Sequence, residues 1–136
     1  MEDVLKAKEL LKDDKTLVFV KGNEIVDSTL SGIKPLIYFL NENKDLKGFS
    51  LADKIVGKAQ AMLCIKAGIV EVYAKVLSLN GKEILEKYNI PYSYETLTDQ
   101  IINHKGDDIC PMEKVVKDID DIEEAYKALK EKVLSM

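Results

Sequence analysis

The stretch GFSLADKIVGKAQAMLCIKAG, residues 48–68, decides the fold class. Residues 48–52 predict a short buried strand, and Asp53 directly after them is a suitable N-cap for a helix. We expect this helix over residues 54–67, with Gly68 ending it. The expected helix is apolar on nearly all sides, which is typical of a helix that packs inside a domain.

The rest of the chain continues this alternation of strand and helix. Residues 16–20 and 24–29 flank the turn pair Gly22-Asn23 and predict a β-hairpin. Further strands are expected over residues 70–74 and 92–96, and helices over residues 4–11, 34–43, 80–88, 110–117 and 122–136. Such an alternation is typical of parallel crossovers on a sheet covered by helices. The sequence therefore predicts an α/β protein with a single domain over residues 1–136.

Composition narrows the range of partners. The chain has 20 Lys and Arg residues interleaved with 24 Asp and Glu residues and a net charge of -4, so duplex nucleic acid is not an expected partner. The longest mostly apolar segment, residues 59–72, is shorter than the about 20 residues that span a bilayer. The acidic N-terminal segment lacks the features of a signal peptide, so we expect a cytoplasmic protein without a membrane partner.

The start of the helix expected after Asp53 is the first candidate site. A helix N-terminus carries unpaired N–H groups and a partial positive charge, which favour an anion. Lys54 and Lys58, four residues apart, would add two ammonium groups, and the small Gly57 would allow a ligand to approach closely. These residues predict a site for phosphate or carboxylate. Equally, they are consistent with a capped helix and two solvated lysines.

The run Cys110-Pro111-Met112-Glu113 is the second candidate site. Cys110 is expected at the N-cap, Pro111 at the first helical position, and Glu113 where its carboxylate can reach back to the cap N–H. A cysteine at a helix N-terminus has an increased thiolate content, so Cys110 is a candidate nucleophile or ligand contact. The alternative is that Cys110 only caps the helix.

Three further residues have side chains that can bind a ligand or a metal. Ser78 ends an expected strand, where open α/β sheets bind ligands, although a cap serine is the simpler interpretation. Cys64 is expected to be a small core residue, and His104 to lie in a loop or at a helix end. These residues lack the spacing of a zinc site. We therefore expect neither a metal nor another cofactor.

The hairpin, DKIVGKA at residues 53–59, VYAKVLS at residues 72–78 and CPME at residues 110–113 resemble an uncharacterised family of small prokaryotic proteins. This family is a domain of unknown function with a cytidine-deaminase-like fold. The resemblance covers nearly the whole chain and implies a three-layer α/β/α sandwich with a mixed sheet. Active deaminases of this fold bind zinc through H-x-E at one helix start and P-C-x-x-C at the next, and the glutamate shuttles protons.

This sequence departs from both deaminase motifs. Asp53-Lys54-Ile55 stands where H-x-E is expected, and Leu77 to Gly81 stand where P-C-x-x-C is expected. The Cys110-Pro111 pair has the reverse order and comes later in the chain. Zinc-dependent deamination is therefore not expected. The two helix starts could still form a pocket, lined by Asp53, Lys54 and Ser78 together with Cys110 and Glu113.

Three functions remain open from the sequence. The first is a metal-free deaminase-like domain that binds a small anionic ligand, such as a nucleotide or a phosphorylated metabolite. The second is an enzyme of unassigned reaction that uses Cys110 with Asp53 and Lys54. The third is a structural or homo-oligomerisation module that pairs through residues 35–41 or the C-terminal helix.

Overall fold

A five-stranded mixed sheet organises the chain. The computed structural model describes residues 2–12, 14–103 and 105–135. The elements are α1 (Glu2–Leu10), β1 (Leu17–Lys21), β2 (Glu24–Ser28), α2 (Lys34–Asn41), β3 (Ser50–Val56), α3 (Lys58–Ala67), β4 (Glu71–Ser78), α4 (Leu79–Lys87), β5 (Tyr92–Thr98), α5 (Pro111–Val116) and α6 (Ile122–Leu134). The sheet order is β2-β1-β3-β4-β5, with β1 antiparallel to both neighbours and β3, β4 and β5 parallel. The predicted hairpin and the mixed sheet are confirmed.

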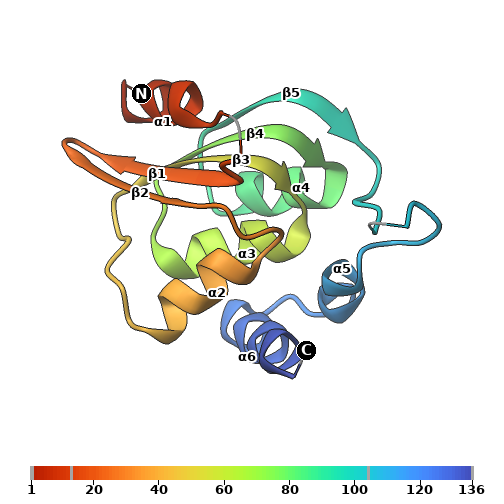
Figure 1. Ribbon diagram of the computed structural model, residues 1–136. Coiled ribbons are helices and arrows are strands. Elements are labelled where there is room, and N and C mark those ends of the chain that lie inside the picture. The colour runs from red at the N-terminus through yellow and green to blue at the C-terminus, as the bar shows by residue number, and fades with distance from the viewer. Residues whose placement is uncertain (1, 13, 104, 136) are drawn as a thin grey trace.

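Helices cover both faces of the sheet in three layers (Figure 1). Helix α1 lies on one face, where Val4 and Ala7 pack with Val18, Val20 and Ala52. Helices α2, α3 and α4 lie on the other face, together with α5 and α6 (Figure 1), and Phe39 of α2 packs edge-on against Phe19 of β1. The predicted three-layer α/β/α sandwich is therefore confirmed. None of the described helices is long and apolar enough to cross a membrane.

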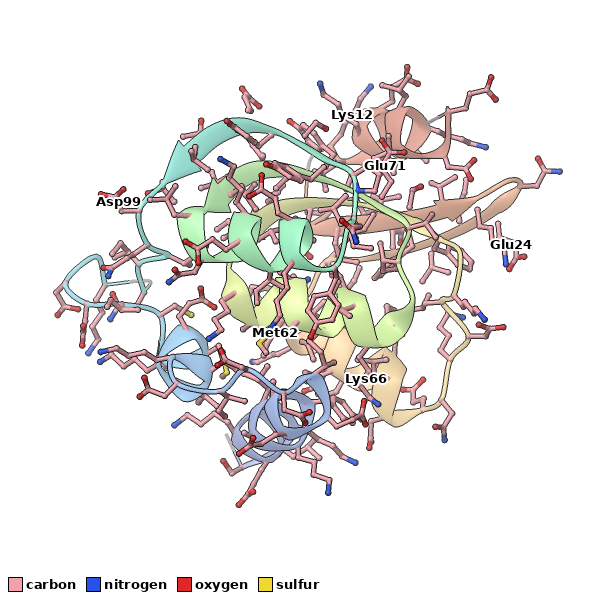
Figure 2. The ribbon with its side chains drawn as sticks, turned by 180° about the vertical axis from the view of Figure 1, so that it is seen from behind. Lys12, Glu24, Met62, Lys66, Glu71 and Asp99 are labelled. Carbon is pink, nitrogen blue, oxygen red and sulfur yellow. The ribbon has the colours of Figure 1, made fainter. Side chains whose placement is uncertain are left out.

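Helix α3 lies at the centre of the larger core. Most of its residues are buried, as the apolar sequence predicts, and Gly68 ends it in the left-handed conformation with a φ of 80°. Met62 lies in the interior, whereas Lys66, one turn further along, reaches Glu123 of α6 at 2.8 Å (Figure 2). On the last helix, α6, an apolar stripe formed by Ala125, Leu129 and Val133 is buried.

The boundary between β3 and α3 differs from the prediction. Strand β3 continues to Val56, and α3 begins only at Lys58 with Gly57 as its N-cap. The reason is strand pairing, because Asp53 lies opposite Leu17 of β1 and Ala74 of β4, and Val56 lies opposite Leu77. Ladder hydrogen bonds on both sides outweigh the helix-start pattern of Asp53 and Lys54. Consequently Asp53 is a strand residue and not a helix cap.

The other predicted elements occur with smaller shifts. Helix α2 ends at Asn41, two residues before the predicted end, and β4 and β5 extend further than predicted, to Ser78 and Thr98. Helix α4 begins directly after Ser78. Helix α6 ends at Leu134, and the predicted helix end at Met136 lies outside the described residues.

We predict that the packing of α6 on the α3 side of the sheet is a main source of stability. Leu129 is fully buried, whereas Leu134 on the same helix is 54% exposed. Leu129→Ala should lower the free energy of unfolding by about 2–5 kcal/mol, because it leaves a cavity in the core. Leu134→Ala, the matched control, should change it by less than about 0.5 kcal/mol. Urea unfolding measures both, and equal effects would contradict this assignment of α6.

Candidate functional site

A cavity of about 270 Å³ opens beside the C-terminal half of β3. Residues of β3 and the start of α3 form one part of its wall, and the segment before α2, the loop after β5 and the start of α5 form the rest. In open α/β sheets, ligands bind near the carboxyl ends of parallel strands. Its described lining residues are Thr16, Ser31, Gly32, Ile33, Asp53, Lys54, Ile55, Gly57, Ala59, Gln60, Ile101, Ile102, Asn103, Cys110, Pro111, Met112 and Glu113.

Asp53 and Gln60 form a buried polar pair in this cavity. They are 4% and 2% exposed, and Nε2 of Gln60 donates a hydrogen bond to Oδ2 of Asp53 at 2.7 Å. Burial raises the pKa of Asp53 to about 7, although the hydrogen bonds from Gln60 and the backbone oppose this shift. The amide oxygen of the pair, Oε1 of Gln60, has no hydrogen-bond partner among the described residues.

Glu113 binds the N-terminus of α3. Its two carboxylate oxygens accept hydrogen bonds from the backbone N–H groups of Lys58 and Ala59, each at 2.8 Å. The prediction that the Glu113 carboxylate accepts from the cap N–H of its own helix is wrong, because both of its oxygens bind α3 instead. The unpaired N–H groups and the partial positive charge of the ten-residue helix α3 attract the carboxylate. The anion expected at this helix start is thus supplied by the chain itself.

Gly57 makes this contact sterically possible. A Cβ atom at Gly57 would lie 2.3 Å from Oε1 of Glu113 and 2.8 Å from Ile101. Gly81 of α4 packs against the same turn, since a Cβ there would lie 3.0 Å from the carbonyl of Gly57. The small residue that the sequence interpretation assigned to ligand approach therefore allows close contact with the chain itself.

The two lysines of the predicted anion site lie apart from each other. Lys54 belongs to β3 and lines the cavity, whereas Lys58 belongs to α3. Nζ of Lys58 donates to the carbonyl of Lys117 at 3.3 Å and lies 3.8 Å from Asp120. The prediction that both lysines extend from one helix face is wrong, because the chain between them changes from strand to helix.

Ser78 acts as the N-cap of α4, the simpler of its two predicted roles. Its hydroxyl accepts a hydrogen bond from the N–H of Gly81 at 2.9 Å, and the residue is 1% exposed. Ser78 lies with Lys58 and Glu113 in a neighbouring hollow of about 110 Å³. The structure therefore brings five of the predicted site residues to the main cavity, namely Asp53, Lys54, Gly57, Cys110 and Glu113.

The two cysteines have different surroundings. Cys64 is fully buried, and burial together with the nearby charge of Asp53 raises the pKa of its thiol. Cys110 is half-buried at the N-cap of α5 and lines the main cavity. Its side chain makes no cap hydrogen bond. Cys110 therefore differs from a simple cap residue both in this respect and in its position in the cavity wall.

Zinc, which the deaminase resemblance implies, does not fit the residues present. Helix α3 begins at Gly57-Lys58-Ala59, which corrects the position at which H-x-E was sought, and α4 begins after Ser78. Neither start offers a histidine or cysteine ligand. Within residues 2–12, 14–103 and 105–135, no three His, Cys, Asp or Glu residues are grouped to hold a metal. His104 lies outside the described residues, and the absence of zinc stays a prediction.

Sequence reasoning missed several parts of the cavity. Gln60 interrupts an apolar run, residues 59–65, and this polar interruption was the available signal. Met112 and residues 101–103 reach the cavity through the loop after β5 and the start of α5. Local periodicity gives no information about where such a loop folds back.

Comparison with known proteins shows the family of this chain. Residues 6–133 match the family model TM1506, described as a domain of unknown function (DUF1893), and the chain belongs to this family. The chain is similar to the crystal structure of a DUF1893 family protein from Thermotoga maritima, with 31% identity, a TM-score of 0.85, and coverage of 99% of this chain and 90% of that chain. No curated protein matches.

A weaker similarity links the chain to the dCMP deaminase of the cyanophage S-TIM5 in apo form. The identity is 13% and the TM-score 0.46, with coverage of 68% of this chain and 94% of that chain.

We predict that Asp53 makes stability depend on pH in a definite direction. An unperturbed Asp side chain has a pKa of 3.8, whereas the pKa of Asp53 in the folded protein is about 7. Between these values the folded protein therefore holds a proton that the unfolded chain has released. The free energy of unfolding falls as pH rises from about 4 to about 7, by up to about 1.4 kcal/mol per pH unit, and levels off above. Asp53→Asn should remove this component.

Urea unfolding between about pH 4 and pH 8 measures this effect. Asp53→Asn keeps an oxygen that accepts from Gln60 but turns its NH2 group toward the Ile55 N–H that donates to Oδ1 in the wild type, so the slope with pH, and not the absolute stability, is compared. Asp99, exposed at the periphery (Figure 2), provides the control variant Asp99→Asn. Identical pH profiles for the wild type and Asp53→Asn would contradict the assignment.

A second prediction concerns the contact between Glu113 and α3. Glu113→Ala should lower the free energy of unfolding by about 1–3 kcal/mol, because two backbone N–H groups lose their acceptor. Glu113→Gln keeps one acceptor oxygen and should lose less. Glu131→Ala, at an exposed glutamate of α6, is the matched control. If Glu113→Ala unfolds at the same urea concentration as this control, the carboxylate does not stabilise α3.

Proposed function

We propose that this protein binds a small organic molecule in the cavity beside β3. The observation that carries the proposal is the buried pair of Asp53 and Gln60 in the cavity wall, in which Oε1 of Gln60, an atom with almost no exposed surface, has no hydrogen-bond partner among the described residues. Buried polar atoms are almost always hydrogen-bonded, because an unpaired one loses its hydration without replacement. A ligand that pairs with this oxygen would remove that penalty.

The walls and the size of the cavity support the same function. Ile33, Ile55, Ile102 and Met112 give the cavity an apolar lining around the buried pair. Its volume of about 270 Å³ lies just below the range of about 300–1,000 Å³ that is typical of pockets for drug-sized ligands. This combination suits a molecule with one ring and a polar substituent.

The proposal keeps the small ligand that the sequence predicts. It does not keep the prediction that the ligand is an anion, because that prediction depended on a free N-terminus of α3. Glu113 already accepts from Lys58 and Ala59 at that terminus. A phosphate or carboxylate group would therefore bind there only by displacing the Glu113 carboxylate. Anionic ligands, including nucleotides and phosphorylated metabolites, belong in the test for this reason.

A second candidate function is an enzyme that uses Cys110. The observation in its favour is that the Cys110 side chain lines the same cavity as Asp53 and Lys54. A thiolate there would attack a bound electrophile. Fast alkylation of Cys110 would favour this candidate if the alkylation rate increases with pH around a midpoint well below the pKa of a free thiol.

The third function expected from the sequence, a structural or homo-oligomerisation module, loses its main argument. Leu36 and Ile37 of α2 and Leu129 of α6 are buried within the chain. These apolar faces are therefore already used in the core and do not require a second subunit.

Ligand binding is tested by a thermal-shift screen combined with cysteine labelling. The probes are AMP, CMP, ribose 5-phosphate and benzamide. We expect at least one probe to raise the melting temperature and, by filling the cavity, to slow the alkylation of Cys110 by iodoacetamide. The buried Cys64 is the internal reference, and mass spectrometry follows both sites.

A blocking variant shows whether the probe lies in this cavity. Ile102, 50% exposed, lines the cavity, and Ile102→Trp should fill part of it and abolish both effects. Leu97→Trp, at a residue of β5 that is 37% exposed and outside the cavity, should leave both unchanged. The proposal is wrong if no probe protects Cys110, or if Ile102→Trp has no effect on the protection.

A further inference from the structure

The acceptor groups of the cavity identify the chemistry of its ligand. Asp53, Glu113 and Gln60, whose amide oxygen has no partner among the described residues, line it, whereas Lys54 is the only lysine among the described lining residues. Lys58 directs its ammonium group to the carbonyl of Lys117 and toward Asp120. Among the described lining residues, the two acidic side chains therefore outnumber the one lysine.

Two other polar side chains of the lining, those of Thr16 and Asn103, already have partners. The hydroxyl of Thr16 donates to the carbonyls of Ser28 and Leu30. The amide of Asn103 donates to Asp107 and accepts from the backbone N–H groups of Gly106 and Asp107. The contacts of Thr16 join it to Ser28 and Leu30, and those of Asn103 stay within its own loop. They leave the Gln60 oxygen as the acceptor that needs a donor from elsewhere.

The contact with Asp53 fixes which atom Gln60 presents. Nε2 of Gln60 donates to Oδ2 of Asp53 at 2.7 Å, and with the amide in this orientation Oε1 is the atom without a partner. The same carboxylate has its other oxygen, Oδ1, at 3.3 Å from the N–H of Ile55, a long hydrogen bond. Both side chains thus have capacity to accept further hydrogen bonds.

The start of α3 does not offer an anionic ligand the free N–H donors that it would need. The N–H groups at the start of α3 that would bind it already donate to Glu113 at 2.8 Å. Placing phosphate in the cavity would also bring its charge close to Asp53 and Glu113, and like charges in a partly desolvated site repel strongly.

From these contacts we infer that the ligand is an uncharged or cationic molecule that donates N–H hydrogen bonds to Gln60 and Asp53 from an apolar ring. A primary amide, an amidine or an amino-substituted heterocycle has this chemistry. The inference rests on the proposed binding function and specifies the class of ligand, which excludes phosphates and carboxylates as the group that binds the buried pair.

Three probes that share one ring test the inference directly. Benzamide and benzamidine carry N–H donors, and benzoate carries acceptors alone. At about pH 8, where Asp53 is ionised, we expect benzamide and benzamidine to slow iodoacetamide alkylation of Cys110. Their dissociation constants from ¹H–¹⁵N NMR titration should be at least about tenfold lower than that of benzoate.

Variants of the buried pair separate hydrogen bonding from charge. Gln60→Met preserves side-chain volume and should weaken benzamide by about tenfold, whereas Gln100→Met, at an exposed glutamine outside the cavity, should not. Asp53→Asn should weaken benzamidine more than benzamide, because only the amidinium needs the negative charge. Circular dichroism of each variant checks that it folds, and the Asp53→Asn comparison stands independently of Gln60→Met.

The outcomes distinguish this inference from the proposed function. If benzoate or AMP protects Cys110 better than the two donor probes do, the ligand class is wrong and the binding function stands. Benzamide affinity that is unchanged in Gln60→Met also overturns the ligand class. If none of these compounds protects Cys110, both the ligand class and the proposed function are wrong.

Discussion

The pairing of β3 with strands on both sides is the constraint from which the site follows. Because β3 has β1 on one side and β4 on the other, its backbone stays extended through Val56. Asp53 is therefore held inside the sheet, with its side chain near Gln60 and Cys64 of α3. Burial of this carboxylate costs free energy, and the hydrogen bond from Gln60 offsets part of that cost. The cavity beside the pair is enclosed by the segment before α2, the loop after β5 and the start of α5.

The carboxylate of Glu113 determines how the N-terminus of α3 is used. It joins α5 to α3 across 54 and 55 positions of the sequence, with two hydrogen bonds of 2.8 Å. This contact anchors the start of α5 beside the cavity, which places Cys110, Pro111 and Met112 in its wall. The same contact removes the helix terminus from the groups available to a ligand. A single side chain thus shapes the cavity and changes the ligand chemistry that the cavity favours.

The sequence predicted the elements better than their boundaries. The hairpin, the buried helix ended by Gly68, and the stripe on α6 depend on local signals, namely turn residues, a left-handed cap and apolar periodicity. The end of β3 depends on pairing with β1 and β4, which no local pattern specifies. Asp53 and Lys54 favour a helix start when considered alone, so the local signal was misleading there. Five of the seven predicted site residues line the main cavity, but their geometry differs from the prediction, and their role in binding stays a prediction.

The starts of α3 and α4 carry other groups than the deaminase motifs would place there. In active deaminases of the resembling fold, these two helix starts carry the zinc ligands. Here Gly57 and Gly81 bring the two backbones so close that a Cβ at Gly81 would lie 3.0 Å from Gly57. Ser78 uses its hydroxyl to cap α4, and Glu113 caps α3. Glu113 and Ser78 thus each satisfy a helix terminus, and under the proposed function the groups that recognise the ligand are Gln60, one turn into α3, and its partner Asp53.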